Sequence, residues 1–114
     1  MDTTGIEAAL RRGRSATLVQ LEQLRRDLDD VVTAAADVAT DDEHDPEGAT
    51  IAYERSRTKA LIAQAEAHLA EVALAFDRLA AGSYGTCVRC GRSIGTERLQ
   101  ARPVAGTCID CAAP

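Results

Sequence analysis

The sequence predicts a mainly α-helical protein. A long antiparallel coiled-coil helical hairpin is expected over residues 1–81, followed by a small C-terminal module organised by four cysteines over residues 82–114. Apolar and small residues repeat at heptad spacing along most of the chain, and all four cysteines fall in two pairs near its end. Aromatic residues make up only 3% of the chain. So few large side chains do not build a thick globular core, whereas long helices packed through small residues suit this composition.

The first predicted helix runs from Ile6 to Val38. Apolar or small residues recur there in alternating steps of four and three, which is typical of a coiled-coil face. The seam positions are Ile6, Leu10, Gly13, Thr17, Leu21, Leu24, Leu28, Val31, Ala35 and Val38. A repeat sustained over this length predicts one long helix.

The second predicted helix keeps the same alternation, with polar interruptions near its start. Its seam positions are Ile51, Arg55, Thr58, Ile62, Ala65, Leu69, Val72, Phe76 and Leu79. Asp45 is suited to the N-cap and Pro46 to the first helical position. Gly82 is suited to the C′ position just past the helix. These signals predict a helix that begins next to residue 46 and ends before residue 82.

Two helices of similar length joined by a short connection predict an antiparallel hairpin. At about 35 residues each, the helices would be roughly 50 Å long. Neither would be stable alone in water, so the seam between them has to supply most of the stability. The alternative is a homodimer of single long helices. Pro46-Glu47-Gly48 interrupts a continuous helix, and we therefore expect a monomeric hairpin.

The connection between the two helices is strongly acidic. Six acids and no Lys or Arg lie in this segment, at Asp37, Asp41, Asp42, Glu43, Asp45 and Glu47. The whole chain has a formal net charge of −5, which argues against nonspecific nucleic-acid binding as its main activity. A solvated turn is the ordinary interpretation of an acidic loop. Negative charge at the far end of a long hairpin also fits a probe for a metal ion or a basic pocket.

The four cysteines form two CxxC pairs, Cys87 with Cys90 and Cys108 with Cys111, separated by 17 residues. This spacing lets each pair supply two thiolates from one tight turn and predicts a four-thiolate zinc site. Gly91 directly after the first pair allows the positive φ that such a turn needs. Four thiolates close the coordination sphere, so we expect one structural zinc per chain and no metal catalysis.

Other interpretations of the cysteines are weaker. A redox dithiol sits at a strand-to-helix junction that this sequence does not predict. Disulfides need an oxidising compartment, and the acidic, polar start of the chain does not resemble a secretory signal. A rubredoxin-like iron centre is packed with aromatic residues, whereas Tyr84 is the single aromatic residue of this module. No apolar run approaches the roughly 20 residues needed to span a bilayer, so we expect a cytoplasmic protein without a membrane partner.

The residues around the cysteines resemble the zinc finger of the DksA/TraR family, whose members bind bacterial RNA polymerase. The stretches that carry the resemblance are 85–91, 94–95, 98–99, 101–103 and 108–111. The order of the parts, with the hairpin first and the finger second, also agrees. The resemblance implies a transcription regulator that is not an enzyme. Its hairpin would enter the polymerase secondary channel and place acidic tip residues near the catalytic magnesium, in some members together with the alarmone ppGpp.

The resemblance assigns roles to individual residues. It makes the four cysteines the zinc ligands. Arg98 matches a position that supports polymerase contact, and Arg102 matches an arginine of the family's alarmone site. At the tip, at about residues 40–48, the family pattern is Asp-x-x-Asp-x-Ala. Here Asp45 and Ala49 keep their types, and Glu47 stands in for the second aspartate in a segment one residue shorter.

One departure affects the alarmone. The family has a lysine directly after the last cysteine, and this chain has Ala112. An alarmone site built from a lysine and an arginine would be incomplete here. Polymerase binding is therefore expected to survive better than the response to ppGpp.

Two other functions stay open on the sequence. A Gre-like factor would use tip carboxylates to hold a second catalytic metal and stimulate transcript cleavage, although Gre factors lack a zinc finger. A zinc-capped coiled-coil scaffold for another partner would offer a nucleic-acid patch at Arg89, Arg92, Arg98 and Arg102. The zinc tetrathiolate adds about −2 of charge beside those arginines, so no sequence-specific DNA binding is expected.

Overall fold

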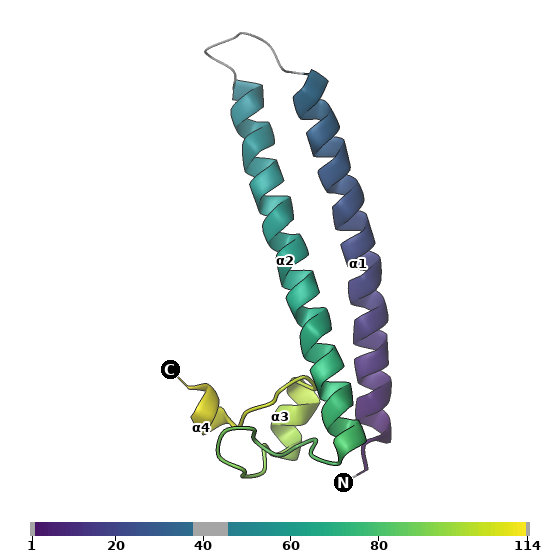
Figure 1. Ribbon diagram of the computed structural model, residues 1–114, viewed down its shortest axis with the longest axis vertical. Helices are drawn as coiled ribbons and strands as arrows, with labels where there is room; N and C mark the ends of the chain where they lie inside the picture. Colours follow the sequence, from purple (N-terminus) through teal and green to yellow (C-terminus); the bar gives the residue numbers. More distant parts are fainter. Residues whose placement is uncertain (1, 38–45, 114) are drawn as a thin grey trace. The chain divides into compact units, whose positions relative to one another are not determined.

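The computed structural model describes residues 2–37 and 46–113. Within these residues lie four helices: α1 (Thr4–Asp37), α2 (Pro46–Ala81), α3 (Thr96–Ala101) and α4 (Ile109–Ala112) (Figure 1). Two long antiparallel helices followed by a four-cysteine module confirm the predicted fold class. None of the helices in these ranges combines the length and hydropathy that a membrane span requires.

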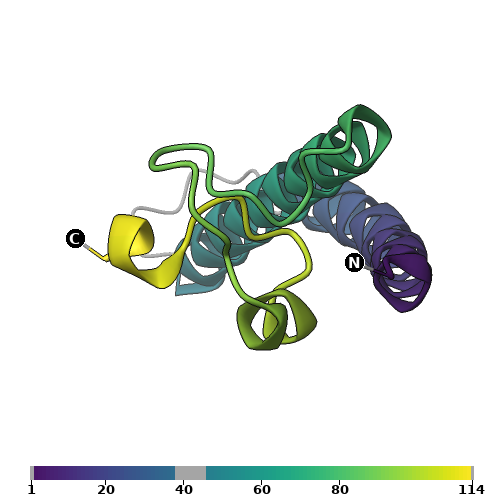
Figure 2. The same ribbon diagram turned by 90° about the horizontal axis from the view of Figure 1, so that it is seen from below.

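The chain divides into two compact units. The distal unit comprises Thr17–Ala67, and the base unit comprises Met1–Ala16 together with His68–Pro114. Both long helices contribute to each unit, whereas α3 and α4 belong to the base unit alone. Figure 2 views the base unit from below, with the link after α2 and the two short helices in front.

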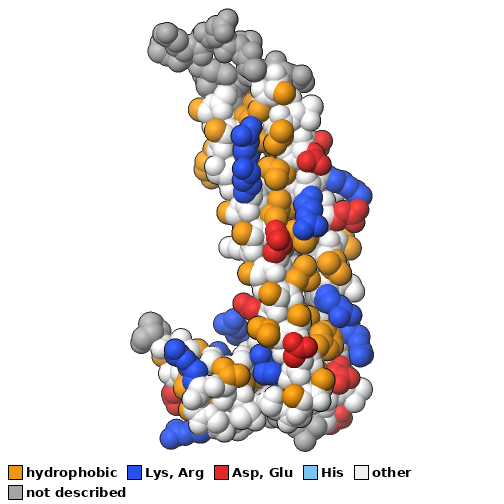
Figure 3. All heavy atoms as spheres, in the orientation of Figure 1, with side chains coloured by type: hydrophobic (Ala, Val, Ile, Leu, Met, Phe, Trp, Pro, Cys, Tyr) orange, Lys and Arg blue, Asp and Glu red, His pale blue; other side chains and the backbone are white. Residues whose placement is uncertain are grey.

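The predicted heptad seam is the buried face of both long helices. Every seam residue that the structure describes is buried or half-buried, and Val38 lies outside the described residues. The exposed fraction is 2% for Leu10, 4% for Leu21 and 2% for Val72. In the distal unit, Figure 3 shows hydrophobic side chains in a line between the helices, with charged side chains on both flanks. The predicted phase of the repeat is thus confirmed.

Polar residues interrupt the seam in the distal unit. Thr17 and Thr58 are each 9% exposed. Arg55 is half-buried, and its Nε has no hydrogen-bond partner among the described residues. A buried donor left without a partner costs roughly 1–3 kcal/mol. Arg55 therefore contributes less stability than the leucine and valine positions of the same seam.

Helix α2 ends where the sequence predicts, with Gly82 at the C′ position. Gly82 has φ 77°, the left-handed conformation expected at C′. Its N–H donates to the carbonyl of Leu79 at 3.2 Å, and the N–H of Ser83 donates to the carbonyl of Arg78 at 2.9 Å. These two bonds form a Schellman motif, which satisfies the last carbonyls of the helix. The turn leads the chain from α2 into the cysteine module.

Leu21→Asp is expected to destabilise the distal unit by roughly 3–5 kcal/mol, because it replaces a buried seam leucine with a carboxylate that has no partner. Val19→Asp is the matched control, because Val19 is 68% exposed and lies two residues away. The control is expected to change the stability by less than about 0.5 kcal/mol. Denaturant unfolding followed by circular dichroism measures both. Equal stabilities of the two variants would show that the assigned seam is wrong.

Candidate metal centre

The first cysteine pair lies in a tight turn after the link that follows α2. The N–H of Cys87 donates to the carbonyl of Arg92 at 2.8 Å, and the N–H of Gly91 donates to the carbonyl of Cys87 at 2.9 Å. Gly91 has φ 76°, as its position after Cys90 predicts. A residue with a Cβ would be strained in that conformation. The local sequence therefore brings the two sulfurs of this pair together within a single turn.

The second cysteine pair is organised by α4. Cys108 is the N-cap residue of this helix, and Cys111 lies within its 4 residues. The N–H of Ala112 donates to the carbonyl of Cys108 at 3.0 Å and closes the turn. A spacing of three residues around one helical turn places both sulfurs on the same side.

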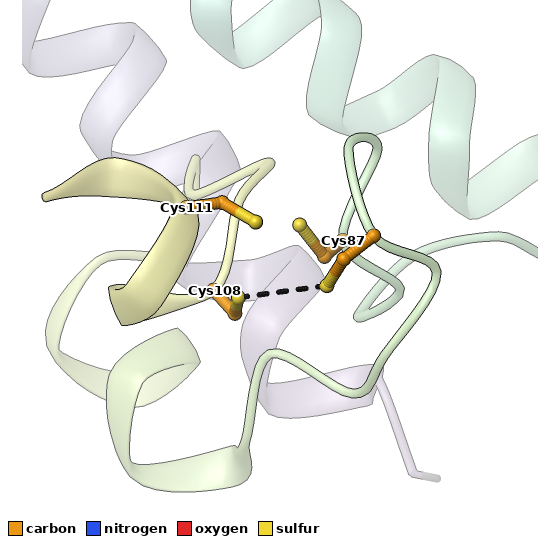
Figure 4. A group of neighbouring side chains, drawn as sticks. Cys87, Cys108 and Cys111 are labelled. Carbon is orange, nitrogen blue, oxygen red and sulfur yellow. Dashed lines mark hydrogen bonds between the residues drawn. The ribbon is translucent and has the colours of Figure 1, made fainter.

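The four sulfurs form one cluster. All lie within 4.8 Å of one another, and Cys90 Sγ is 3.7 Å from Cys108 Sγ. Figure 4 shows the labelled side chains of Cys87, Cys108 and Cys111 directed toward a common centre. Tetrahedral zinc with Zn–S bonds of about 2.3 Å requires sulfurs about 3.8 Å apart. None of the four cysteines is in a disulfide. Their number, chemistry and separation fit one zinc ion.

Backbone amides stabilise the thiolate form of one ligand. Hydrogen bonds from the backbone N–H groups of Cys108 and Cys90 lower the pKa of Cys87 to about 6. The pKa of Cys111 is raised to about 12, because hydrogen bonds with the Cys108 and Cys87 sulfurs favour its protonated form. Thiolates this close repel one another unless a cation lies between them. Zinc binding therefore releases protons, and the affinity for zinc falls as the pH is lowered.

The module has a small core that includes metal ligands. Its buried members are Cys87, Ile94, Leu99, Ala105 and Cys108, with Tyr84 and Cys111 packed against them. Val88 and Ile109 are apolar, but their exposed fractions are 66% and 68%. The hydrophobic core without its cysteines is therefore too small to hold the fold, and the metal has to supply the missing stability.

The segment that leads into Cys108, residues 103–107, is held through its backbone carbonyls. The donors come from the end of α2, the link after it, the first cysteine turn and α3. The bonds run from Arg78 Nη2 to Val104 (3.1 Å), from the Tyr84 hydroxyl to Pro103 (2.8 Å), from the Val88 N–H to Gly106 (2.9 Å) and from Arg98 Nε to Thr107 (3.0 Å). Both cysteine pairs and the base of the hairpin thus meet at this segment.

Arg98 has a partner inside the module. It is half-buried in α3, and its Nε bond to Thr107 ties this helix to the residue before Cys108. This internal bond helps to hold the second cysteine pair in place. The polymerase contact expected from the resemblance stays a prediction for this side chain.

Arg102 is exposed and lines a cavity of about 440 Å³ in the base unit. Three guanidinium groups, those of Arg78, Arg98 and Arg102, share the lining with the carboxylate of Glu71. The charged side chains around the cavity are therefore positive on balance. Ala112 also lies on its wall.

Comparisons with known proteins agree with this geometry. The family model for the prokaryotic dksA/traR C4-type zinc finger matches residues 82–114. The RNA polymerase-binding transcription factor DksA of Haemophilus influenzae is 40% identical over 57 residues, which cover 50% of this chain and 34% of that protein. The structure of the transcription factor DksA2 from Pseudomonas aeruginosa matches with a TM-score of 0.54 and 26% identity. That match covers 98% of this chain and 87% of the other.

Residues 82–114 of this chain match the DksA/TraR C4-type zinc-finger family. The resemblance inferred from the motifs is confirmed, and the matched finger contains all four clustered cysteines. The site is accordingly a C4 zinc site that holds one structural zinc. In the match to the curated DksA, the chain spans about a third of the length of that relative, 34%.

The tip of the hairpin is only partly described. Asp45, which was expected to act at the tip and to cap α2, lies outside the described residues. Glu47 is in the first turn of α2, which begins at Pro46 as predicted, and Ala49 is exposed. The roles of these residues at the tip stay predictions.

Sequence reasoning assigned no structural role to Arg78 or Gly106, and it used Tyr84 only as the single aromatic residue of the module. Arg78 carries one local signal, because it is the basic residue in the last turn of α2, where positive charge faces the negative end of the helix dipole. That signal does not reveal its partner, Val104, which is 26 residues further along the chain. No periodic pattern connects the three residues.

Proposed function

We propose that this chain is a transcription regulator that binds bacterial RNA polymerase. It inserts the acidic tip of its coiled coil into the secondary channel and modulates initiation. The observation that carries the proposal is the joint presence of both parts in the family order. The likeness to DksA2 extends over 98% of the chain, and the matched finger follows the two long helices. The curated relative is itself named for polymerase binding.

Different parts of the chain have different roles in this function. The finger, with Arg98, and the flanks of the hairpin bind the polymerase near the mouth of the channel. Asp45 and Glu47 act by their charge near the catalytic magnesium, while Ala49 keeps the adjoining surface small. The protein performs no catalysis of its own, because its zinc is enclosed by four thiolates. It acts as a monomer in the cytoplasm, where its partner is found.

Co-purification with RNA polymerase and photo-crosslinking test this proposal. A crosslinker at position 49 is expected to label segments next to the polymerase catalytic centre. One at Val88, which is exposed on the finger, is expected to label the outer surface of the channel. Failure to co-purify would overturn polymerase binding. Binding without any label inside the channel from position 49 would overturn the proposed mode. Increased transcript cleavage on stalled complexes would favour the Gre-like alternative.

The response to ppGpp is expected to be weak. Arg102 and Ala112 line the same cavity, so the position at which the family has a lysine lies beside the arginine. Ala112→Lys is expected to lower the ppGpp concentration needed for an effect about tenfold or more, because it adds one charge-assisted bond to a phosphate. The measurement is the change in open-complex lifetime with increasing ppGpp.

The neighbouring Ala113 is exposed and provides the matched control, Ala113→Lys. Adding Arg102→Ala to the Ala112→Lys variant is expected to remove the gain. An equal gain from both lysine variants would indicate general attraction by added charge and would contradict an alarmone site in this cavity.

A further inference from the structure

We propose that Arg78 is a positioning residue for the zinc site. It fixes the 103–107 segment, and with it the Cys108 and Cys111 half of the site, against the end of α2. The proposal concerns the assembly of the metal site, and it stands independently of polymerase binding.

The backbone of Arg78 is held by the turn that ends α2, independently of the contacts of its side chain. Its carbonyl accepts the N–H groups of Ser83 at 2.9 Å and Tyr84 at 3.1 Å in the turn that closes α2. A rigid helix end therefore carries the guanidinium. Nη2 donates to the carbonyl of Val104 at 3.1 Å, and the buried Nε has no partner among the described residues. The bond to Val104 satisfies one donor of a half-buried guanidinium, a group that is costly to remove from water.

Gly106 leaves the space that the guanidinium fills. A Cβ at this position would lie 3.4 Å from Arg78 Nη1 and 3.5 Å from its Cζ. Gly106 is not among the residues with positive φ, so the backbone itself would accept a side chain. These distances are ordinary van der Waals contacts, so alanine would fit here, whereas a longer side chain would meet the guanidinium. A branched side chain there would push the guanidinium away from Val104.

The segment held by Arg78 contacts both halves of the zinc site. The carbonyl of Gly106 accepts the N–H of Val88, the residue after Cys87. Thr107 directly precedes Cys108 and is bound by Arg98. Loosening residues 104–106 therefore shifts the ligands of the second pair and weakens the bond that links the first cysteine turn, through Val88, to this segment.

Arg78→Met tests the proposal, because methionine keeps an unbranched stem and removes every donor. Amide hydrogen exchange by NMR on the zinc-loaded protein is the readout, with the N–H of Val88 and Ala105 as reporters. Their exchange is expected to become about ten to a hundred times faster, the range for loss of a hydrogen bond from a charged donor. Transfer of zinc to a chelator is expected to accelerate as well.

Reference amides separate positioning from general instability. The N–H of Cys87, bonded to Arg92 within the first turn, and that of Leu99, bonded to Gly95, are expected to keep their exchange rates. Arg57→Met is the matched control variant, because Arg57 is exposed on the same helix. It is expected to leave all four rates within about twofold.

A double-mutant cycle with Gly106→Val completes the test. If both residues act through one guanidinium position, the double variant is expected to exchange no faster than the faster single variant.

Arg78→Lys retains one donor, and its Val88 and Ala105 exchange rates are expected to lie between those of the wild type and of Arg78→Met. This variant also keeps the test possible if Arg78→Met does not fold. Unchanged Val88 and Ala105 exchange in Arg78→Lys and Arg78→Met would overturn the proposal, and so would additive effects in the cycle.

Discussion

Removal of zinc is expected to unfold the C-terminal finger while most of the helical structure persists. Structural zinc contributes on the order of 10–16 kcal/mol to small modules of this kind. The finger core contains two ligands, Cys87 and Cys108, among its five buried residues, so little remains when the metal is lost. The helices α1 and α2 have 34 and 36 residues and their own seam, whereas α3 and α4 have 6 and 4.

Metal analysis and circular dichroism before and after chelation measure this outcome. One equivalent of zinc is expected after purification without chelators, and adding zinc back is expected to restore the finger. Cys108→Ser is expected to reproduce the loss, because Cys108 is a buried ligand. Less than half an equivalent of zinc would contradict the assignment. Complete loss of the helical signal would show that the hairpin depends on the metal.

Neutralising the tip is expected to abolish the effect on initiation while leaving polymerase affinity nearly unchanged. Asp45→Asn with Glu47→Gln keeps the shape of the side chains and removes their charge. Under the proposed function, affinity comes from the finger and the flanks of the hairpin. The tip charge acts near magnesium and mobile loops, where a water-poor channel strengthens electrostatic interactions. The measurement is open-complex lifetime and abortive-product yield at a ribosomal promoter, with binding followed in parallel.

The matched control is Asp29→Asn with Glu54→Gln, which makes the same charge change at two exposed positions of the long helices. This control is expected to retain the effect on initiation. Ala49→Thr adds bulk beside the charged residues and is expected to weaken the effect. An unchanged open-complex lifetime with the neutralised tip would show that the acidic segment is only a solvated turn.

The sequence by itself determined the parts of this protein that rest on short-range, repetitive patterns. A seam residue such as Leu21 is buried because the heptad period matches the helical period, and neighbouring turns of the same helix reinforce that signal. Gly82 and Gly91 could be placed because a positive φ strongly favours glycine. The zinc ligands followed from two CxxC pairs, since each pair occupies one local turn.

Only the tertiary structure decided how the finger is held together. Val88 and Ile109 are as apolar as Ile94 and Leu99, yet the first two are exposed and the last two are buried. The bonds of Arg98 to Thr107 and of Arg78 to Val104 join residues that are 9 and 26 positions apart. Such contacts have no period in the sequence, because a small module built around a metal is organised by its ligands and by single hydrogen bonds to backbone carbonyls. The sequence could therefore locate the zinc, whereas the structure was needed to find the arginine that positions its second pair of ligands.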